Sequence, residues 1–277
     1  MTEHLTVEGG TIAYELTGTE GPLVVLAHGM GDSRAAYRFL VPELVAAGHR
    51  VANVDLRGCG ESSAVWPSYS RTDIAGDLLA VVRHLGGPAV LVGHSISGGA
   101  VTIAAAQAPE LVTALVELTP FTRKQAVSLK DLRSARFRRG MLHLVGTGVL
   151  GSAGQWRKYL EIAYPGPKPA DWAERSAQVD AMLAEPGRMK AVQKMGMTPA
   201  TDAGAALGDV RCPVLVVQGT LDPDWASPQA EGEAILAELP DGLGRLAMVE
   251  GAGHYPHVQH PARVLAVLLP FLASVDA

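Results

Sequence analysis

The sequence has few of the residues that characterise several broad classes of protein. It contains only two cysteines, Cys59 and Cys212, which cannot form a framework of disulfides and so favour a reducing, cytoplasmic location. The opening stretch MTEHLTVEGG has no basic segment followed by an apolar one, so it does not look like a secretion signal. A net charge of −5 provides no electrostatic basis for binding nucleic acid or an anionic membrane surface.

Long uninterrupted hydrophobic runs are also missing. Residues 85–109 include no Asp, Glu, Lys or Arg, but Pro88 and the polar Gly93-His94-Ser95 divide this stretch into a short strand and a helix. We therefore expect no membrane segment. At 277 residues the chain is long enough for one domain with a sizeable core.

Alternating strand and helix patterns predict the fold class. Four near-continuous apolar runs are typical of parallel strands that helices cover on both faces. Helical patterns lie between them, so we expect an α/β fold with a mostly parallel, doubly wound sheet. The opening segment HLTVEGGTIAYELTG predicts an antiparallel hairpin around Gly9-Gly10. The four runs begin at Pro22, His49, Pro88 and Cys212.

Local signals mark two helices. Ser70 and Asp73 have the spacing of a capping box, which predicts a helix that begins directly after Ser70. A last helix should begin at Pro261. It contains Pro270, which should kink or end it.

The alternation of strands and helices stops after Pro120. Residues 121–208 show helical patterns and no confident strand. We therefore expect residues 1–120 and 209–277 to form the α/β core and residues 121–208 to form an inserted helical cap. The cap aromatics could line an apolar substrate pocket or pack the cap's own small core. The candidate pocket residues are Trp156, Tyr159 and Trp172 from this segment and His28 from the core.

The cap segment begins with a strongly basic run. Residues 123–139 contain seven Lys and Arg residues and one acidic residue. Such a run is usually a solvated helix face. The alternative is a docking surface for an acidic substrate or carrier protein.

The most informative stretch is GHSISGG, which separates a strand pattern from a helix pattern. A serine hydroxyl becomes a nucleophile only if it is exposed and a base removes its proton. A sharp turn between strand and helix would expose the hydroxyl of Ser95, and the small residues Gly93 and 97–99 permit such a turn. The helix that begins at Ile96 also directs free N–H groups at the reacting centre. Ser97 is the alternative nucleophile, but it would lie on the first helical turn.

Five short fragments are each a weak signal of a protein family, but together their order and spacing are a strong one. They are HGMGDS (28–33), DLRGCGES (55–62), GHSISGG (93–99), GTLDPD (219–224) and EGAGHYPH (250–257). In this order and spacing the chain resembles the α/β-hydrolase superfamily, in its serine-nucleophile, esterase-like branch with a helical cap. The resemblance covers the core and not the cap. It implies the chain order nucleophile, acid, base. A serine at position 95 argues against the related epoxide hydrolases and dehalogenases, which use a carboxylate nucleophile. One departure is Ser97, where the superfamily usually has glycine.

His254 is the candidate general base. It follows a short strand pattern, and the small residues before it leave room for its ring to turn toward Ser95. His257 and His260 lie farther from the strand end and are interpreted as rim or surface residues. His94 should be packed and hydrogen-bonded, with its side chain directed away from that of Ser95.

Asp222 is the candidate orienting acid, which would hold the imidazole and stabilise its cation. It follows Gly219 at the carboxyl end of a strand, where open α/β sheets place their sites. Asp224 is an alternative two residues away. Glu117 is a second alternative, since some members of the superfamily carry the acid after that strand.

The resemblance also implies roles for the backbone and for a loop. The oxyanion hole would use the backbone N–H groups of Ile96 and Met30, and the glycines beside Met30 let the chain turn inward. Asp55, Arg57 and Ser62 are interpreted as structural residues. An ion pair between Asp55 and Arg57 would lock the loop beneath the site.

These features predict a serine hydrolase that cleaves an ester or related acyl bond of a small, apolar substrate, with no metal or organic cofactor. A carbon–carbon bond hydrolase or a cofactor-free perhydrolase would use the same three residues. A non-catalytic ligand receptor on a hydrolase scaffold is the alternative from a different class.

Overall fold

Eight strands form one sheet, in the order β1-β2-β4-β3-β5-β6-β7-β8, in the computed structural model, which describes residues 1–275. β1 pairs antiparallel with β2, β2 pairs antiparallel with β4, and the other neighbours are parallel. The predicted mostly parallel sheet and the N-terminal hairpin are therefore confirmed. The strands are β1 (Thr2–Val7), β2 (Gly10–Thr17), β3 (Leu23–Ala27), β4 (Arg50–Val54), β5 (Ala89–His94), β6 (Val112–Leu118), β7 (Val214–Gly219) and β8 (Gly244–Val249).

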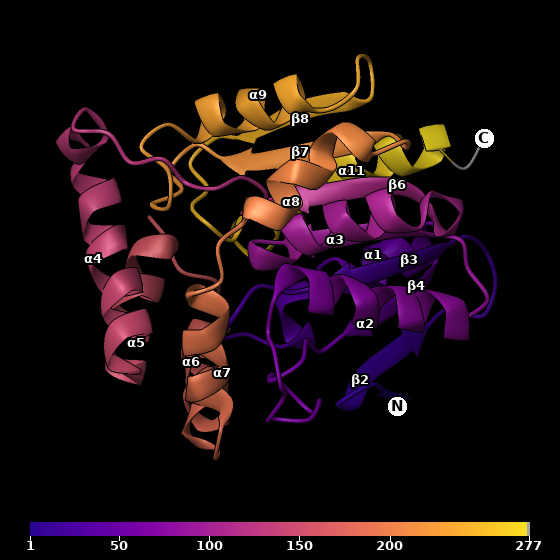
Figure 1. Cartoon of the computed structure of the whole chain (residues 1–277), viewed down its shortest axis with the longest axis horizontal. Coiled ribbons are helices and arrows are strands. Elements are labelled where there is room, and N and C mark those ends of the chain that lie inside the picture. The colour runs from indigo at the N-terminus through magenta and orange to yellow at the C-terminus, as the bar shows by residue number, and fades with distance from the viewer. Residues whose placement is uncertain (276–277) are drawn as a thin grey trace.

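Helices cover both faces of this sheet (Figure 1). Successive strand residues point to opposite faces, so Val25 and Leu91 join one hydrophobic cluster while Val24 and Val92 join the other. Burial on both faces explains why the strands read as continuous apolar runs. The first cluster is completed by α2 (Arg71–His84), α3 (Ile96–Gln107), α8 (Thr201–Ala206) and α9 (Pro228–Glu238), and the second by α1 (Val41–Ala46) and α11 (Pro261–Val275).

The start of α2 and the length of α11 test the two local signals. Ser70 Oγ accepts a hydrogen bond from the Asp73 backbone N–H at 3.0 Å, and the Asp73 carboxylate accepts one from the Ser70 N–H at 3.0 Å. The predicted capping box is therefore confirmed. α11 does not end at Pro270 but continues beyond it. Buried contacts such as those of Leu268 hold this helix against the sheet despite the backbone hydrogen bond that a proline removes.

The described residues between β6 and β7 form helices and loops without a strand. α4 to α7 gather at one end of the sheet (Figure 1), whereas α8 packs on α3 and its Ala203 belongs to the main core. α7 also contributes to that core, through Ala191 and Met195. The helices gathered at this end of the sheet are α4 (Ala135–Leu150), α5 (Ala153–Ala163), α6 (Trp172–Ala184) and α7 (Arg188–Gly196). The remaining helical elements are α10 (Pro256–Gln259) and the 3-10 helices Arg34–Tyr37, Pro109–Leu111, Asp131–Arg133 and Leu207–Asp209.

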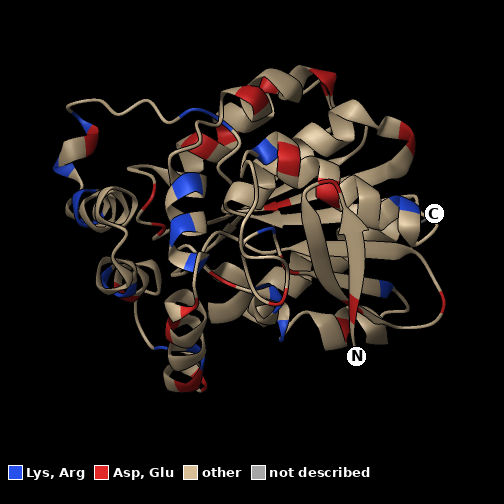
Figure 2. Cartoon of the chain, turned by 60° about the horizontal axis from the view of Figure 1, so that its bottom comes forward, with Lys and Arg blue, Asp and Glu red and all other residues tan. Residues whose placement is uncertain are grey.

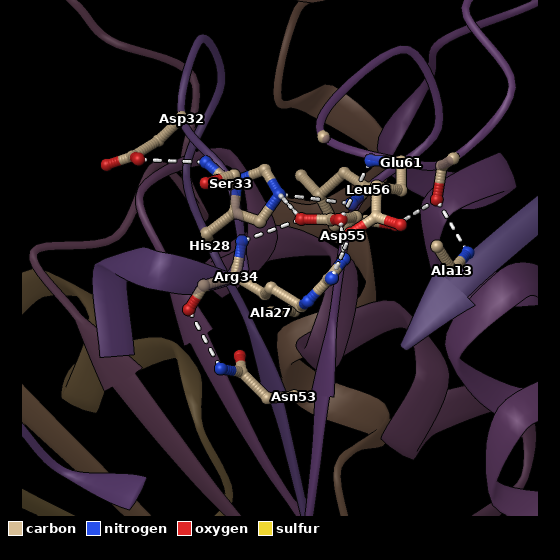
Figure 3. A network of polar contacts seen from close by, with 12 residues as sticks. Ala13, Ala27, His28, Asp32, Ser33, Arg34, Asn53, Asp55, Leu56 and Glu61 are labelled. Carbon is tan, nitrogen blue, oxygen red and sulfur yellow. Dashed lines mark hydrogen bonds and ion pairs between the residues drawn. The ribbon is translucent and has the colours of Figure 1, made fainter. Parts of the chain in front are cut away.

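A buried carboxylate, Asp55, joins the loops that follow β3 and β4 (Figure 3). It accepts hydrogen bonds from the backbone N–H of Arg34 at 2.7 Å and of Glu61 at 2.9 Å, and it forms an ion pair with the Arg34 guanidinium. Ser62 Oγ donates to the Asp55 backbone oxygen at 2.7 Å and accepts from the Ala13 N–H at 2.8 Å. These contacts tie both loops to β2.

The predicted ion pair between Asp55 and Arg57 is wrong. Arg57 instead binds both carboxylate oxygens of Asp77 in α2, at 2.7 and 2.8 Å, and its guanidinium lies over the ring of Trp66. The chain turns between the two residues, so Asp55 faces the loop after β3 while Arg57 faces α2. Each finds a different partner of opposite charge.

Charged residues of both signs are interspersed over the helices and loops (Figure 2). In the basic run 123–139, Arg123 forms ion pairs with Glu231 and Glu238 of α9, and Arg136 donates to the Asp222 backbone oxygen at 3.3 Å. The other five basic residues of the run are exposed. Within residues 1–275, no helix has both the length and the apolar composition that crossing a bilayer would need.

Candidate active site

Ser95 occupies the turn between β5 and α3. Its φ of 56° and ψ of −119° lie outside the regions that residues other than glycine ordinarily adopt, as a sharp strand-to-helix turn requires. The neighbouring residues must be small. A Cβ on Gly93 would lie 2.2 Å from the Ser97 backbone oxygen, and one on Gly98 would lie 2.4 Å from Cβ of Pro120.

Ser97, the alternative nucleophile, lies on the first turn of α3 and is buried. Its Oγ donates a 2.6 Å hydrogen bond to the backbone oxygen of His28. The hydroxyl that replaces the usual glycine therefore joins the start of α3 to the loop after β3. Ser97 does not border the cavity described below.

His254 follows β8 and directs its Nδ1 at two carboxylates. This nitrogen lies 3.0 Å from Oδ2 of Asp222 and 3.2 Å from Oδ2 of Asp224, and all three side chains are buried. Burial alone lowers the pKa of His254, but the charges of Asp222 and Asp224 raise it to about 9 overall. The arrangement favours an imidazolium ion, so it stabilises His254 after it accepts a proton.

The three candidate acids differ in their partners. Asp222 accepts a hydrogen bond from His254 and, through Oδ1, from the Asp224 backbone N–H at 3.0 Å. Asp224 accepts from the Tyr159 hydroxyl at 2.7 Å, and burial raises its pKa to about 7.

Glu117 lies apart from this group. Its carboxylate accepts hydrogen bonds from the hydroxyls of Thr102 and Thr122, and burial raises its pKa to about 7. It has no hydrogen bond or ion pair with His254 in the part of the chain that the structure describes.

The same cluster has the residue types of a metal site. The ligand atoms of Asp222, Asp224 and His254 all lie within 4.8 Å of one another. The Nδ1···O distances of 3.0 and 3.2 Å also suit an N–H···O hydrogen bond between the imidazole and the two acids.

The other histidines near the turn are packed. His94 is buried and its Nε2–H donates to the His254 backbone oxygen at 2.8 Å, so it supports the loop that carries the candidate base. The prediction that His257 lies at the rim or surface is wrong. Because α10 packs against the 3-10 helix after β3, the His257 ring is buried and stacks on Tyr37 with centroids 5.1 Å apart. Burial lowers its pKa to about 3. His260 is half-buried.

A cavity of about 550 Å³ opens beside Ser95. Ser95 and His254 border it, as do Met30 and Ile96, whose backbone N–H groups are the candidate oxyanion donors. Across residues 1–275 no hydrogen bond joins Ser95 Oγ to the His254 ring, so the two groups share the cavity wall without a direct bond. Catalytic hydrogen bonds of this kind often form only when substrate binds.

Two of the four candidate pocket residues border this cavity. Trp156 and Tyr159 stack on each other in α5, with centroids 5.0 Å apart, and both line the wall. The prediction for Trp172 is wrong, because this side chain packs against Tyr164 with centroids 4.7 Å apart and does not reach the cavity.

The prediction that His28 lines the pocket is also wrong. Its Nδ1–H donates to the Gly29 backbone oxygen at 2.7 Å, and its Nε2 accepts from the Leu56 N–H at 3.1 Å (Figure 3). Both ring nitrogens therefore form hydrogen bonds with the backbone of the loops after β3 and β4. Burial lowers the pKa of this histidine, which agrees with a neutral ring.

Sequence patterns did not indicate most of the cavity wall. Arg71, a charged residue at the start of α2, borders the cavity although no motif pointed to it. Apolar positions on a helix look alike whether they face a cavity or a packed core, so no sequence signal separated them. The apolar wall includes Met141, Leu144, Val145 and Val149 of α4 and Val192 and Met195 of α7.

Comparison with known proteins agrees with this geometry. The model of the Alpha/beta hydrolase family matches residues 24–267. The chain is similar to the protein named "Putative carbamate hydrolase RutD" of Variovorax paradoxus, with 31% identity over 279 residues that cover 95% of this chain and 97% of that one. It is 29% identical over 261 residues to the 2-(acetamidomethylene)succinate hydrolase of Mesorhizobium japonicum, covering 91% and 88%.

A solved structure extends the similarity to the whole fold. A thermophilic esterase from Thermogutta terrifontis superimposes with a TM-score of 0.73 and 26% identity, and the match covers 100% of both chains. The family match spans most of this chain, from β3 into α11. The protein therefore belongs to the alpha/beta hydrolase family.

Proposed function

We propose that this hydrolase cleaves an ester or related acyl bond through an acyl-enzyme intermediate, with Ser95 as nucleophile, His254 as general base and Asp222 as orienting acid. One observation carries the proposal. Ser95 stands in a strained strand-to-helix turn and borders the same cavity as His254, whose Nδ1 lies 3.0 Å from Asp222. A hydroxyl, an imidazole and a carboxylate are the groups that acyl transfer of this type requires.

The proposed reaction has two steps that share one base. His254 takes the proton of Ser95 Oγ, which attacks the substrate carbonyl carbon, and the backbone N–H groups of Met30 and Ile96 stabilise the oxygen that becomes negative. His254 then gives this proton to the leaving group as the bond to the carbonyl carbon breaks. In the second step His254 removes a proton from water, the water attacks the acyl-enzyme, and Ser95 regains its proton.

The helices between β6 and β7 are proposed to form the cap over this site. α4, α5 and α7 supply mostly apolar wall residues, which would bind the apolar body of a small acyl substrate. The names of the relatives, a carbamate hydrolase and a hydrolase of an acetamido compound, extend the candidate scissile bonds from esters to carbon–nitrogen bonds. The cap side chains would select among them.

The two cysteines support a reducing compartment, such as the cytoplasm, as the place of action. Cys59 and Cys212 are both free and buried. Burial raises the pKa of Cys59 to about 12 and of Cys212 to about 11, so neither thiol is activated. The two cysteines thus form no disulfide that would need an oxidising compartment.

Covalent labelling tests the proposed nucleophile. A fluorophosphonate probe followed by peptide mapping should modify Ser95 in the wild type and leave Ser95→Ala unlabelled. With a p-nitrophenyl ester, the wild type should show a pre-steady-state burst that Ser95→Ala lacks. Ser97→Ala is the matched control, because it removes the neighbouring hydroxyl and should leave the labelling of Ser95 unchanged.

Two outcomes would contradict the proposal. Labelling of Ser97, or of Ser95→Ala, would show that the wrong hydroxyl is assigned. A wild type that shows no labelling and no burst, but is stabilised against unfolding by acyl compounds, would instead be a ligand receptor.

A further inference from the structure

Arg71, the first residue of α2, borders the cavity beside Ser95 and is only 5% exposed. Two backbone oxygens fix its guanidinium: Nε donates to Phe121 at 3.0 Å, and Nη1 donates to Thr198 at 2.9 Å. Phe121 in turn donates its N–H to the Ser95 backbone oxygen at 2.9 Å. Phe121 therefore links the Arg71 guanidinium to the backbone of Ser95, and Arg71 and Ser95 both border the cavity.

The fold leaves room for this side chain along α3. A Cβ on Gly99, on the first turn after Ser95, would lie 2.8 Å from Cδ of Arg71 and 2.9 Å from Cβ of Ala203. Any larger residue at this position would push against the arginine. Gly99 thus permits the arginine to run past the helix that carries the nucleophile.

The charge of Arg71 has no carboxylate partner in residues 1–275, and its Nη2 makes no hydrogen bond there. Burial lowers its pKa to about 10, and the charge of Asp202 opposes this shift without forming an ion pair. A guanidinium with this pKa is still protonated at neutral pH, and a buried cation without a partner favours an anion beside it. The other two buried arginines each have a carboxylate: Arg57 binds Asp77 at 2.7 Å, and Arg188 binds Glu185 at 3.1 Å.

The contacts of Arg71 bear on which part of the substrate it would meet. In the proposed mechanism His254 must face the leaving group that it protonates. Arg71 runs past Gly99 of α3 and donates to the backbone after β6 and after α7, and within residues 1–275 it has no hydrogen bond to the loop 250–257 that carries His254. We therefore take the part of the substrate that stays on Ser95 as the part that Arg71 meets.

We propose that Arg71 binds a carboxylate on the acyl part of the substrate, an inference that rests on the proposed serine hydrolase function. A planar guanidinium with free N–H groups matches the two oxygens of a carboxylate. The apolar wall contacts the carbon chain that separates this carboxylate from the scissile carbonyl. The substrate class is therefore an acyl compound with a terminal carboxylate, such as a monoester of a dicarboxylic acid, and not a uniformly apolar acyl chain.

A matched pair of esters tests this inference. Mono-4-nitrophenyl adipate carries a terminal carboxylate, and 4-nitrophenyl heptanoate has an uncharged chain of similar length. The wild type should have the higher kcat/KM for the adipate ester. Arg71→Gln should lower this preference by about 10- to 100-fold, which is the size expected for a hydrogen bond between charged groups. Arg71→Lys should retain part of it, because the positive charge remains.

Controls separate a failure of the inference from a failure of the proposed function. Arg211→Gln, at an exposed arginine remote from the cavity wall, should keep the wild-type preference. If Arg71→Gln does not fold, as judged by thermal unfolding, the preference of the wild type and of Arg71→Lys for the adipate ester still tests the carboxylate site. A wild type that cleaves the heptanoate ester as well as the adipate ester overturns the carboxylate site alone. A wild type that cleaves neither ester overturns the serine hydrolase function as well.

Discussion

The hydroxyl of Tyr159 donates a 2.7 Å hydrogen bond to Oδ2 of Asp224, the same oxygen that lies 3.2 Å from Nδ1 of His254. Tyr159 belongs to α5, which stands apart from the sheet, whereas His254 follows the last strand. A side chain of the helical segment is thus linked through one buried carboxylate to the candidate base. The position of α5 and the charge around His254 are therefore coupled.

Removing the Tyr159 hydroxyl should change the titration of His254. The hydroxyl stabilises the charged form of Asp224, so Tyr159→Phe raises the pKa of Asp224 and reduces the negative charge beside the imidazole. The pKa of His254 then falls, and the acid limb of the kcat/KM profile moves to lower pH. Tyr164→Phe is the control, because in the described chain its hydroxyl bonds to no carboxylate. Equal profiles for Tyr159→Phe and the wild type would show that the link has no effect on the base.

The pH dependence of the wild type should follow His254. Burial lowers its pKa, but Asp222 and Asp224 raise it to about 9 overall. Only the neutral ring can accept the Ser95 proton, so kcat/KM should fall as the pH decreases through this pKa. Asp224→Asn removes one negative charge and should move the midpoint to lower pH. A midpoint that stays in place or moves to higher pH argues against a charged Asp224 next to the ring.

The three candidate acids should differ in their effects on turnover. Asp222→Asn should reduce kcat by about 10⁴-fold, because an amide cannot hold the Nδ1–H tautomer. Asp224→Asn should cost roughly 10-fold, since Asp222 still holds the ring. Glu117→Gln should have the smallest effect, because this side chain binds Thr102 and Thr122 rather than His254. A larger loss in Asp224→Asn or Glu117→Gln than in Asp222→Asn would reassign the acid.

Ser97→Ala should reduce stability without moving the nucleophile. Its buried Oγ donates to the His28 backbone oxygen at 2.6 Å, and the alanine leaves that oxygen without this donor. We expect a loss of about 1–3 kcal/mol in the free energy of unfolding, measured by urea denaturation. Ser176→Ala is the control, at a half-buried serine whose side chain makes no hydrogen bond in residues 1–275. Unchanged stability in Ser97→Ala would mean that water replaces the hydroxyl at no cost.

Local rules within the sequence determined much of the framework. Strands β3, β4, β5 and β7 follow from apolar runs that burial on both faces requires, and the start of α2 follows from the pairing of Ser70 with Asp73. The turn at Ser95 was also predictable, because a Cβ on Gly93 would collide with the backbone of Ser97 four residues further on. The contacts that decide the cap of α2 and this turn lie within a few residues of each other in the chain.

Only the tertiary structure decided which distant side chains meet. Asp55 forms its ion pair with Arg34 and not with Arg57. The ring nitrogens of His28 form hydrogen bonds with backbone groups, and the ring does not line the cavity. The second carboxylate on His254 and the unpaired charge of Arg71 also depend on segments far apart in sequence. The direction in which a side chain leaves a loop depends on how helices and loops pack around it. A buried polar group then takes whichever partner that packing brings within hydrogen-bonding distance.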